Sequence, residues 1–449
     1  MFPPIAIRFA SLVLAAAFAL PGCIKDDHSA NDMDASDSAA TADTSLAADA
    51  TPVTGADVAG TDATATVVVF KAKCDAAKAC ATAALCVNGV CVSEPTPDLK
   101  AAIADPDKDH TDSAEPIQLG CIGQNVDDAV KGLPDVKTVT IWGRVDRFGG
   151  GPVTADIEVA VFKFAEFHPE ACAGLTETEA VAACYGNEAK VGKPIAKTVS
   201  VAPGQAAANG LAVEVPKKAG EVCKKHFDCP VGYECRKDSG ATNHICLLTH
   251  GVYAIEGIPT NTRLILRVRG AKAGSKWHDS YLWDYVLFSD RLDPKGTTTQ
   301  PSKYVGKDTY RVNPTLVGDG QWTTFPPTAG VDSIEEGFGV IGGRVRDCGV
   351  PGGRGGWAVH NAKVGLGNAA SGMAFFNDNE DDTVPVKTRS ATDTFGRYAA
   401  VDVPPGPNRV AVAGLVAGKV TPMGSADVYV IPNALVIVSL PGRIPILGK

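Results

Sequence analysis

The sequence predicts an all-β protein with two antiparallel β-sandwiches, small disulfide-rich modules and a disordered N-terminal stalk. Glycine and proline supply 47 and 30 of the 449 residues, a share typical of many short strands joined by turns. Hydrophobic residues make up 45% of the chain, which is enough apolar material for buried cores. A segment near residue 140 recurs near residue 340, and such a repeat indicates two copies of one structural unit.

Residues 1–22 have the features of a secretory signal peptide, with a positive charge at Arg8 and a short apolar run over Ala10–Leu20. The run ends in Leu20-Pro-Gly-Cys23, which resembles the bacterial lipobox. This resemblance implies a lipoprotein, cleaved before Cys23, whose cysteine carries a palmitate-type lipid anchor in the membrane. Ile24 in place of an aspartate favours the outer membrane, on its surface or periplasmic face. The alternative is an ordinary signal peptide followed by an incidental cysteine.

Residues 23–66 are predicted to form the lipid anchor and an acidic stalk. The stretch from Ile24 to Thr66 has nine Asp and one Lys, so it carries −8 of the formal net charge of −9. Charge repulsion and a lack of apolar area keep such a segment extended and disordered, although an acidic binding tail is an alternative. The negative charge and the lack of a basic patch argue against a nucleic-acid partner.

Twelve cysteines remain when Cys23 is assigned to the lipid, and an even number in an exported chain is typical of disulfides. Two clusters share the spacing C-x5-C-x5-C, one within residues 67–95 and one within about 221–248. Their members are Cys74, Cys80, Cys86 and Cys91, and then Cys223, Cys229, Cys235 and Cys246. Zinc sites more often contain C-x2-C pairs, so disulfides are favoured over a metal. Both clusters resemble the small growth-factor-type modules of secreted proteins, and their pairing stays open.

Four cysteines lie outside the two clusters, at positions 121, 172, 184 and 348. Cys172 and Cys184 flank a short predicted helix, and a disulfide between them would staple this excursion. By elimination Cys121 pairs with Cys348, a bond that would tie the two large domains together.

The internal repeat consists of two pairs of matching segments. Thr140-Ile-Trp-Gly-Arg-Val matches Val340-Ile-Gly-Gly-Arg-Val, and each precedes a Gly/Pro turn. Gly251-Val-Tyr-Ala-Ile likewise matches Gly396-Arg-Tyr-Ala-Ala, and a strand of alternating polarity follows each. Strands of this length with period-2 alternation and Gly/Pro turns are typical of antiparallel sandwiches.

The second copy, residues 335–445, resembles the carboxypeptidase regulatory-like domain, a transthyretin-like β-sandwich. The family pattern begins G-x-V-x-D before a Gly/Pro turn, and here Gly343, Val345 and Asp347 match it. The later motif T-D-x-x-G-x-Y is complete from Thr392 to Tyr398. The turn is one residue shorter than the family spacing. The resemblance implies a non-catalytic accessory domain, in which Thr and Asp bond their own turn and Tyr faces the core.

The first copy is assigned to residues 117–290. The Cys172–Cys184 excursion and the second cysteine module, at about 221–248, interrupt it. Insertions of this kind lie in surface loops, where binding residues concentrate. Residues 96–116 are assigned to a linker and residues 291–334 to a connector between the copies.

An aromatic stripe is the first candidate binding surface. Trp277, Tyr281, Trp283 and Tyr285 are expected to share one face of a strand. If exposed, the stripe would suit stacking against a sugar; the alternative, which the composition favours, is that these rings belong to the core.

An acidic run supplies a second candidate site, this time for calcium. Asp378, Glu380 and Asp382 are hard oxygen ligands, but their spacing lacks the EF-hand pattern, so a solvated loop is favoured. No metal site and no cofactor is therefore assigned.

The function expected from these observations is non-catalytic binding or scaffolding at the cell envelope, with an unknown protein or glycan partner held by sandwich loops. No H-x-x-E, HExxH or G-x-S-x-G motif is present, so no catalytic residue is assigned and an enzyme is not expected. The alternative is an accessory subunit of an envelope hydrolase, or a divergent hydrolase. That reading requires His278 or His360 within reach of both a carboxylate and a nucleophile. A purely structural envelope component is a third possibility.

Overall fold

A computed structural model describes most of the chain beyond residue 72. The chain divides into two units, residues 1–62 and 63–449, and every described residue belongs to the second. The described residues are 73–75, 78–80, 84–105, 109–122, 130–135, 137–148, 155–201, 222–223, 233–237, 243–248, 251–270, 275–292, 306–349, 356–368, 370, 372–378 and 385–440. The predicted signal peptide, lipid anchor and stalk lie outside them. No helix in this described part is long and apolar enough to cross a membrane.

Strands dominate the described chain. They are β1 (Ala84–Val87), β2 (Val90–Ser93), β3 (Lys100–Asp105), β4 (Asp109–Asp112), β5 (Thr138–Arg147), β6 (Ile157–Lys163), β7 (Ala196–Val199), β8 (Tyr233–Lys237), β9 (His244–Leu248), β10 (Gly251–Pro259), β11 (Arg263–Gly270), β12 (Trp277–His278), β13 (Ser280–Val286), β14 (Thr309–Arg311), β15 (Thr315–Gly318), β16 (Gly339–Arg344), β17 (Ala358–His360), β18 (Lys363–Leu366), β19 (Gly372–Phe375), β20 (Arg397–Val403), β21 (Gly406–Val416), β22 (Lys419–Val430) and β23 (Leu435–Ile437). The helices are η1 (Phe164–Glu166), η2 (Pro169–Cys172), α2 (Thr178–Tyr185), α3 (Glu188–Val191), η4 (Ser289–Arg291) and α4 (Asp319–Thr328).

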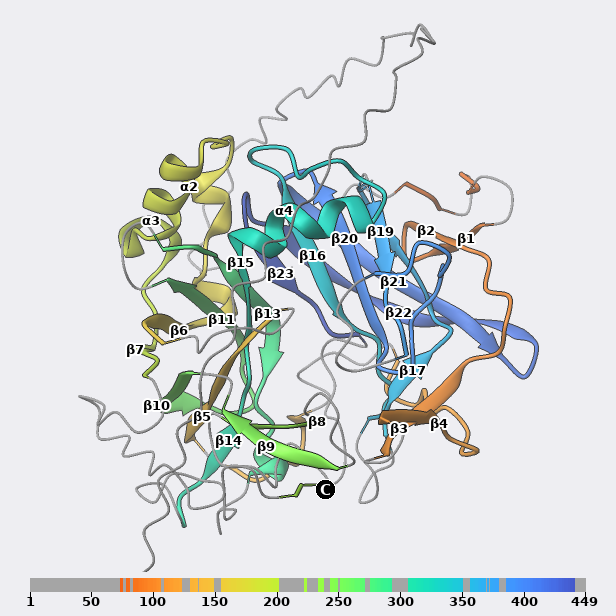
Figure 1. Ribbon diagram of the computed structural model, residues 1–449, viewed down its shortest axis with the longest axis horizontal. Helices are drawn as coiled ribbons and strands as arrows, with labels where there is room; N and C mark the ends of the chain where they lie inside the picture. Colours follow the sequence, from red (N-terminus) through yellow and green to blue (C-terminus); the bar gives the residue numbers. More distant parts are fainter. Residues whose placement is uncertain are drawn as a thin grey trace, which may run out of the picture. The chain divides into compact units, whose positions relative to one another are not determined.

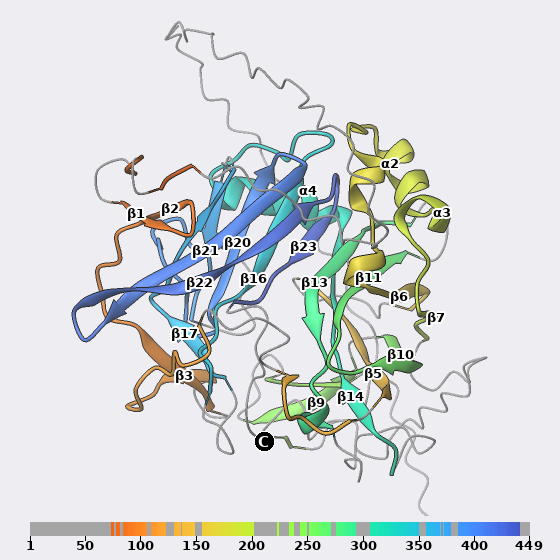
Figure 2. The same cartoon turned by 180° about the vertical axis from the view of Figure 1, so that it is seen from behind.

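The strands form several sheets (Figures 1 and 2). The largest has eight strands in the order β19-β20-β16-β23-β13-β11-β6-β7. A second contains β10-β5-β15-β12, with β14 also paired to β5. Smaller sheets contain β18-β21-β22 and β17-β3-β4, and β1–β2 and β8–β9 are hairpins. The mostly-β class predicted from the sequence is therefore present.

The repeated segments form the same strand pair in both halves of the chain. In the first half β10 runs antiparallel to β5, with Tyr253 opposite Gly143. In the second half β20 runs antiparallel to β16, with Tyr398 opposite Gly343. Because a slip of one residue would turn every side chain to the other face, this identical register shows that the repeat extends to backbone pairing.

Even the irregularities of the two pairs correspond. Each pair has a bulge. In the first half it lies between Ile255 and Ile258 of β10, and in the second half it lies between Ala400 and Val403 of β20. Gly257 and Asp402 occupy equivalent places in these bulges, and both have positive φ, 77° and 57°. Bulges are specific features of a strand pair rather than chance defects, so a common bulge strengthens the equivalence.

A third strand joins each pair in parallel, β14 beside β5 and β23 beside β16. The hydroxyl of Tyr253 donates to the carbonyl oxygen of Val312, just after β14, at 2.7 Å. The hydroxyl of Tyr398 donates to the carbonyl oxygen of Val438, just after β23, also at 2.7 Å. These tyrosines therefore lock equivalent strands, and both are fully buried.

The two halves share the eight-stranded sheet. β13 of the first half pairs in parallel with β23 of the second, with Tyr281 opposite Val436. A disulfide also joins the halves, between Cys121 and Cys348, whose Cα atoms are 5.6 Å apart. The Cys121–Cys348 pairing is the one that the sequence predicted by elimination. The predicted Cys172–Cys184 disulfide is also present.

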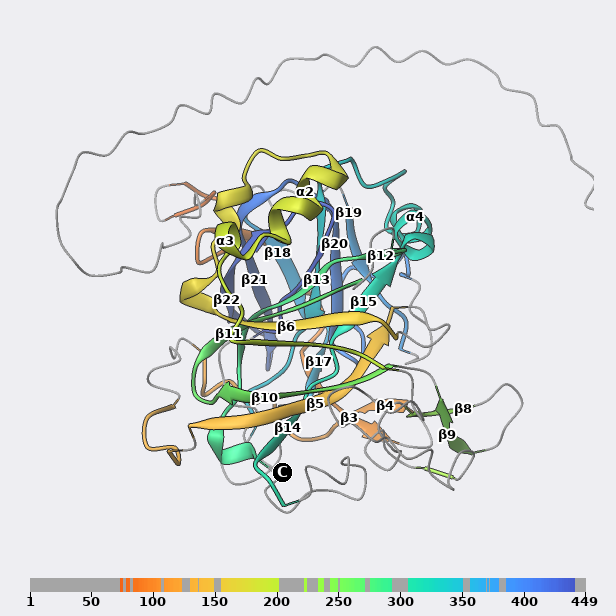
Figure 3. The same ribbon diagram turned by 90° about the vertical axis from the view of Figure 1, so that its left-hand side faces the viewer.

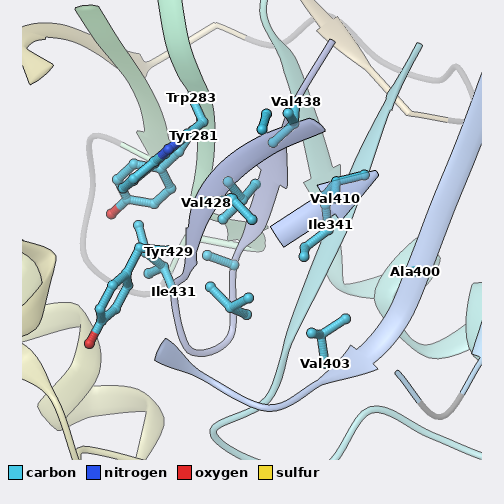
Figure 4. Close-up of a cluster of buried hydrophobic side chains, with 14 of the residues drawn as sticks. Tyr281, Trp283, Ile341, Ala400, Val403, Val410, Val428, Tyr429, Ile431 and Val438 are labelled. Atoms are coloured by element: carbon cyan, nitrogen blue, oxygen red, sulfur yellow. The ribbon is translucent and has the colours of Figure 1, made fainter. Parts of the chain in front are cut away.

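Two buried clusters form the main cores. One combines side chains of β5 and β10, such as Ile141 and Tyr253, with side chains of β6 and β11, such as Val159 and Leu266. The other contains the inward side chains of β16, β18, β20, β21, β22 and β23 and reaches Tyr281 and Trp283 of β13 (Figure 4). The second cluster thus continues across the junction between the two halves.

Strands also occur in the two segments assigned to a linker and a connector. Residues 96–116 contain β3 and β4, and β3 pairs with β17. Residues 291–334 contain β14, β15 and α4, and both strands pair with β5. The sequence assignment missed these strands because each has only three to six residues, and three of them, β3, β14 and β15, pair with strands distant in the chain.

The first cysteine module packs on the second half of the chain. Its disulfides are Cys74–Cys86 and Cys80–Cys91, and they account for the close approach of three of these sulfur atoms. Three valines of its hairpin β1–β2 pack against Ala411 and Ala413 of β21; they are Val87, Val90 and Val92. The module is therefore attached to this sheet by a small core.

The second cysteine module forms the hairpin β8–β9, in which Cys235 lies opposite Cys246. Cys223 and Cys246 each take part in a disulfide. Cys229 lies outside the described residues. The hairpin lies at the end of the molecule opposite α2 and α3 (Figure 3).

Candidate functional site

The predicted aromatic stripe is divided between two faces of the sheet. Tyr281 and Trp283 belong to the core that the two halves share, whereas Trp277 and Tyr285 pack against the first-half core. For Tyr285 the cause is a bulge in β13, where Asp284 has φ of 55° and the register with β11 shifts. Trp277 lies on the separate strand β12, which pairs with β15. A bulge inserts one extra residue and so reverses the alternation of side chains. The four rings therefore do not share one face.

The helical segment from Phe164 to Val191, which contains the Cys172–Cys184 disulfide, covers the two buried rings. The Phe167 ring lies 5.9 Å from Tyr281 and 6.2 Å from Trp283, and Tyr185 of α2 lies 6.4 Å from Tyr281. The indole nitrogen of Trp283 donates to the carbonyl oxygen of Asp427 at 3.1 Å. Burial raises the pKa of the Tyr281 hydroxyl. The segment thus closes a core, and it leaves these two rings unavailable for stacking on a sugar.

Trp277 and Tyr285 are half-buried. The guanidinium carbon of Arg147 lies 5.4 Å from the centre of the Trp277 ring, a distance at which a cation is attracted to an aromatic face. The same guanidinium donates to the side-chain oxygen of Gln321 on α4 at 3.4 Å. Of the predicted stripe, Trp277 is therefore the ring that lies beside polar groups able to orient a ligand.

His278 lies where β12, α4 and the β22–β23 turn meet. Its Nδ1 is 3.1 Å from the carbonyl oxygen of Asn433 and its Nε2 is 3.4 Å from a carboxylate oxygen of Asp319. The Trp322 ring stacks on it at 4.0 Å. Burial lowers the pKa of His278, although the two oxygen neighbours act in the opposite direction. The contacts of this histidine join three elements.

His360 belongs to a small polar cluster on the β17-β3-β4 sheet. Its Nδ1 is 2.9 Å from one carboxylate oxygen of Asp112, and the ammonium of Lys100 donates to the other at 2.8 Å. Partial burial raises the pKa of Asp112, but the two hydrogen bonds outweigh burial and hold the pKa below its usual value. Neither His278 nor His360 contacts a hydroxyl or thiol within the described residues.

Asp378 of the predicted calcium site is engaged by a basic side chain. Arg389 donates to both of its carboxylate oxygens, at 2.8 and 2.5 Å, and the backbone amide of Thr394 donates at 2.9 Å. Partial burial raises the pKa of Asp378, but these donors outweigh it and lower the pKa to about 2. Glu380 and Asp382 lie outside the described residues. Asp378 therefore acts as an anchor for the loop before β20.

The T-D-x-x-G-x-Y motif stabilises the turn that enters β20. The fully buried Asp393 accepts hydrogen bonds from the backbone amide and the side chain of Arg397, at 2.7 and 2.6 Å. Gly396 has φ of 68°, and a Cβ there would overlap the carbonyl oxygen of Val345. The Thr392 hydroxyl donates to the carbonyl oxygen of Val359. The aspartate and the glycine therefore have the roles that the sequence motif predicts, whereas the Thr392 side chain bonds β17 instead of its own turn.

Sequence patterns gave no sign of a Lys–Ser contact in the second half. Lys363 begins β18, and its Nζ donates to both the hydroxyl and the carbonyl oxygen of Ser390, at 2.7 and 2.9 Å. The two residues are 27 positions apart, and a single Lys and a single Ser at that distance match no local motif. Only the fold brings them together.

Comparisons with known proteins identify no family for this chain. No model of a known protein family matches it, and no curated protein matches its sequence. A leucine-rich repeat protein from Bacteroides thetaiotaomicron VPI-5482 is similar over 68% of this chain and 26% of its own length, with 8% identity and a TM-score of 0.14. The chain thus spans about a quarter of that protein, and a similarity this low carries no argument about fold or function.

Proposed function

We propose that this chain is a lipid-anchored cell-envelope protein that acts in binding or scaffolding. The observation that carries the proposal is the way the two halves are joined. Strand pairing between β13 and β23, a shared core and the Cys121–Cys348 disulfide all cross the junction. Relative motion of two halves is the ordinary expectation when their interface is small. Three independent connections suit a scaffold that holds its loops at fixed separations.

The domain class that we propose is a duplicated transthyretin-like sandwich related to the carboxypeptidase regulatory-like domain. In the second half, β20-β16-β23 and β18-β21-β22 would be the two sheets, with a core between them. In the first half, β10-β5-β14 and β6-β11-β13 would be their equivalents. The common register and the turn built by Asp393 and Gly396 support this assignment. One fold can serve many unrelated functions, so the fold alone does not identify a ligand.

The partner-binding surface that we propose is the second cysteine module. The other insertion, from Cys172 to Cys184, turns apolar side chains such as Val181 into a core. Val222, by contrast, is 64% exposed at the base of the β8–β9 hairpin, where it bridges to Ile245. Binding residues concentrate on loop insertions, and Val222 gives this one an exposed apolar side chain for a protein partner. For a glycan partner, the contact that we propose is the Trp277 ring beside the Arg147 guanidinium.

The hydrolase alternative has less support. His278 and His360 each lie near a carboxylate, Asp319 and Asp112. A general base of the serine-hydrolase kind must also contact the nucleophile whose proton it takes. Within the described residues, neither ring has such a contact, so these histidines supply no reaction.

The lipid anchor can be tested by detergent partition of the mature protein. We expect the wild-type chain, expressed with its leader in a bacterium, to enter the detergent phase and to begin at an acylated Cys23, because two or more acyl chains bind membranes stably. The Cys23→Ser variant should enter the aqueous phase while keeping its disulfides. Detergent partition that is equal for both chains, or an unmodified N-terminus, would contradict the proposal.

A further inference from the structure

Among the residues that the structure describes, the buried Lys363 is paired with no carboxylate. It is only 6% exposed, and within the described residues its ammonium nitrogen contacts the two oxygens of Ser390. Lysines elsewhere in the chain, such as Lys100 and Lys197, are paired with Asp112 and Glu188. A buried charge is normally paired with an opposite charge. Ion pairing therefore does not explain why this lysine lies against a serine hydroxyl.

The backbone holds the two residues in position. Residues 362 and 392 bond each other directly: the amide of Thr392 donates to the carbonyl oxygen of Ala362, and the amide of Ala362 donates to the Thr392 hydroxyl, both at 2.9 Å. Lys363 and Ser390 lie one and two residues beyond this double link. Arg389, next to Ser390, is fixed by its two bonds to Asp378. The Lys–Ser contact therefore rests on rigid neighbours, as a preorganised pair must.

Burial makes the neutral amine of Lys363 easier to reach than that of an exposed lysine. Burial lowers the pKa of Lys363, and no other influence on that pKa opposes burial. A neutral amine can accept a proton, whereas an ammonium cannot. Ser390 itself is exposed, so its hydroxyl can meet a molecule from solvent while the base lies behind it.

We propose that Ser390 and Lys363 form a nucleophile–base pair that accepts an acyl group from an uncharged ester. This capacity goes beyond the binding role and uses none of the residues assigned to it. Serine–lysine pairs are one of the known arrangements in which an adjacent amine activates a hydroxyl. The Asp378 carboxylate beside the pair is already held by Arg389, so the substrate that we propose is uncharged.

The reaction balances within the pair, the ester and water. The Ser390 oxygen bonds to the ester carbonyl carbon while its proton passes to the Lys363 amine. The bond from that carbon to the leaving alcohol oxygen then breaks, and the alcohol takes the proton from Lys363. Water can later attack the acyl-serine, give a proton to Lys363 and release the carboxylic acid, with that proton returning to the serine oxygen. No oxidant, reductant or metal is needed.

The test is covalent labelling of the full mature protein with an uncharged fluorophosphonate, followed by peptide mass spectrometry. We expect the label on Ser390, at a rate that rises with pH as Lys363 loses its proton. Ser390→Ala removes one exposed oxygen atom, so it should fold normally and lose this label. Lys363→Arg and Lys363→Met should each label about 100-fold more slowly, the usual contribution of a general base. Ser93→Ala, at another exposed serine, is the matched control and should label as the wild type does.

The arginine variant separates a base from a structural tie. Arginine keeps the positive charge and the hydrogen-bond donors but cannot accept a proton at these pH values. If Lys363→Arg labels as fast as the wild type, or if Ser390→Ala keeps the same labelled peptide, the contact only fixes the loop and the proposal is wrong. A wild-type chain that takes no label between pH 7 and about pH 10, near the ordinary lysine pKa, would overturn it equally.

Discussion

Replacing Cys121 and Cys348 together by serine is expected to lower the free energy of unfolding by about 5 kcal/mol. The bond closes a loop of 227 residues, and the loss of chain entropy in the unfolded state grows with loop length. Both side chains are 5% exposed, so the new hydroxyls would also be buried in place of sulfur. Denaturant unfolding of the oxidised proteins, followed by far-UV circular dichroism, measures the difference.

The Cys172→Ser/Cys184→Ser double variant is the matched control for this change. Its loop is only 12 residues long, so the same entropy argument predicts a loss nearer about 3 kcal/mol. A smaller effect at the long loop than at the short one would show that the Cys121–Cys348 bond does not constrain the two halves.

Gly343→Ala is expected to cost about 3 kcal/mol or more, as overpacking against a fixed backbone does. A Cβ at Gly343 would overlap the carbonyl oxygen of Val438, and one at Gly143 would overlap that of Val312. Each carbonyl follows the parallel strand of its half and accepts the tyrosine hydroxyl bond, so neither can retreat without breaking that bond. Gly143→Ala should therefore be destabilising to a similar degree.

The adjacent Gly342 gives a stringent comparison in the same strand. A Cβ there would meet a flexible leucine methyl group of Leu435 at 3.3 Å, so Gly342→Ala should cost about 1 kcal/mol or less. Thermal unfolding of the three variants tests the argument. Equal losses at Gly342 and Gly343 would mean that strand propensity, and not the close approach of the carbonyl, explains the glycine.

The equivalence of the halves was accessible from the sequence because it depends on local patterns. Gly-Arg-Val and G-x-Y recur in order, and the structure pairs them in one register in both halves. The turn at Asp393 could be anticipated for the same reason, since its hydrogen bonds join residues four apart. Interactions between residues close in the chain determine such features, and short sequence motifs therefore predict them.

Features that depend on distant segments could not be predicted in this way. The bulge at Asp284, which turns Tyr285 to the other face, lies in the pairing of β13 with β11. β14 has three residues and gains its stability from β5, more than 160 positions earlier. Lys363 and Ser390 meet only because Thr392 links two loops. Tertiary context overrides strand periodicity in each of these cases.

Limited proteolysis of the membrane-bound protein tests the scaffold proposal most directly. We expect the earliest cuts to fall in residues 24–66 and to release residues from about 67 to 449 as one fragment that resists further digestion without reductant. That result would agree with a single stapled unit held on a cleavable stalk. Early cuts within residues 96–116 or 291–334, seen as separate fragments once the digest is reduced before electrophoresis, would contradict it.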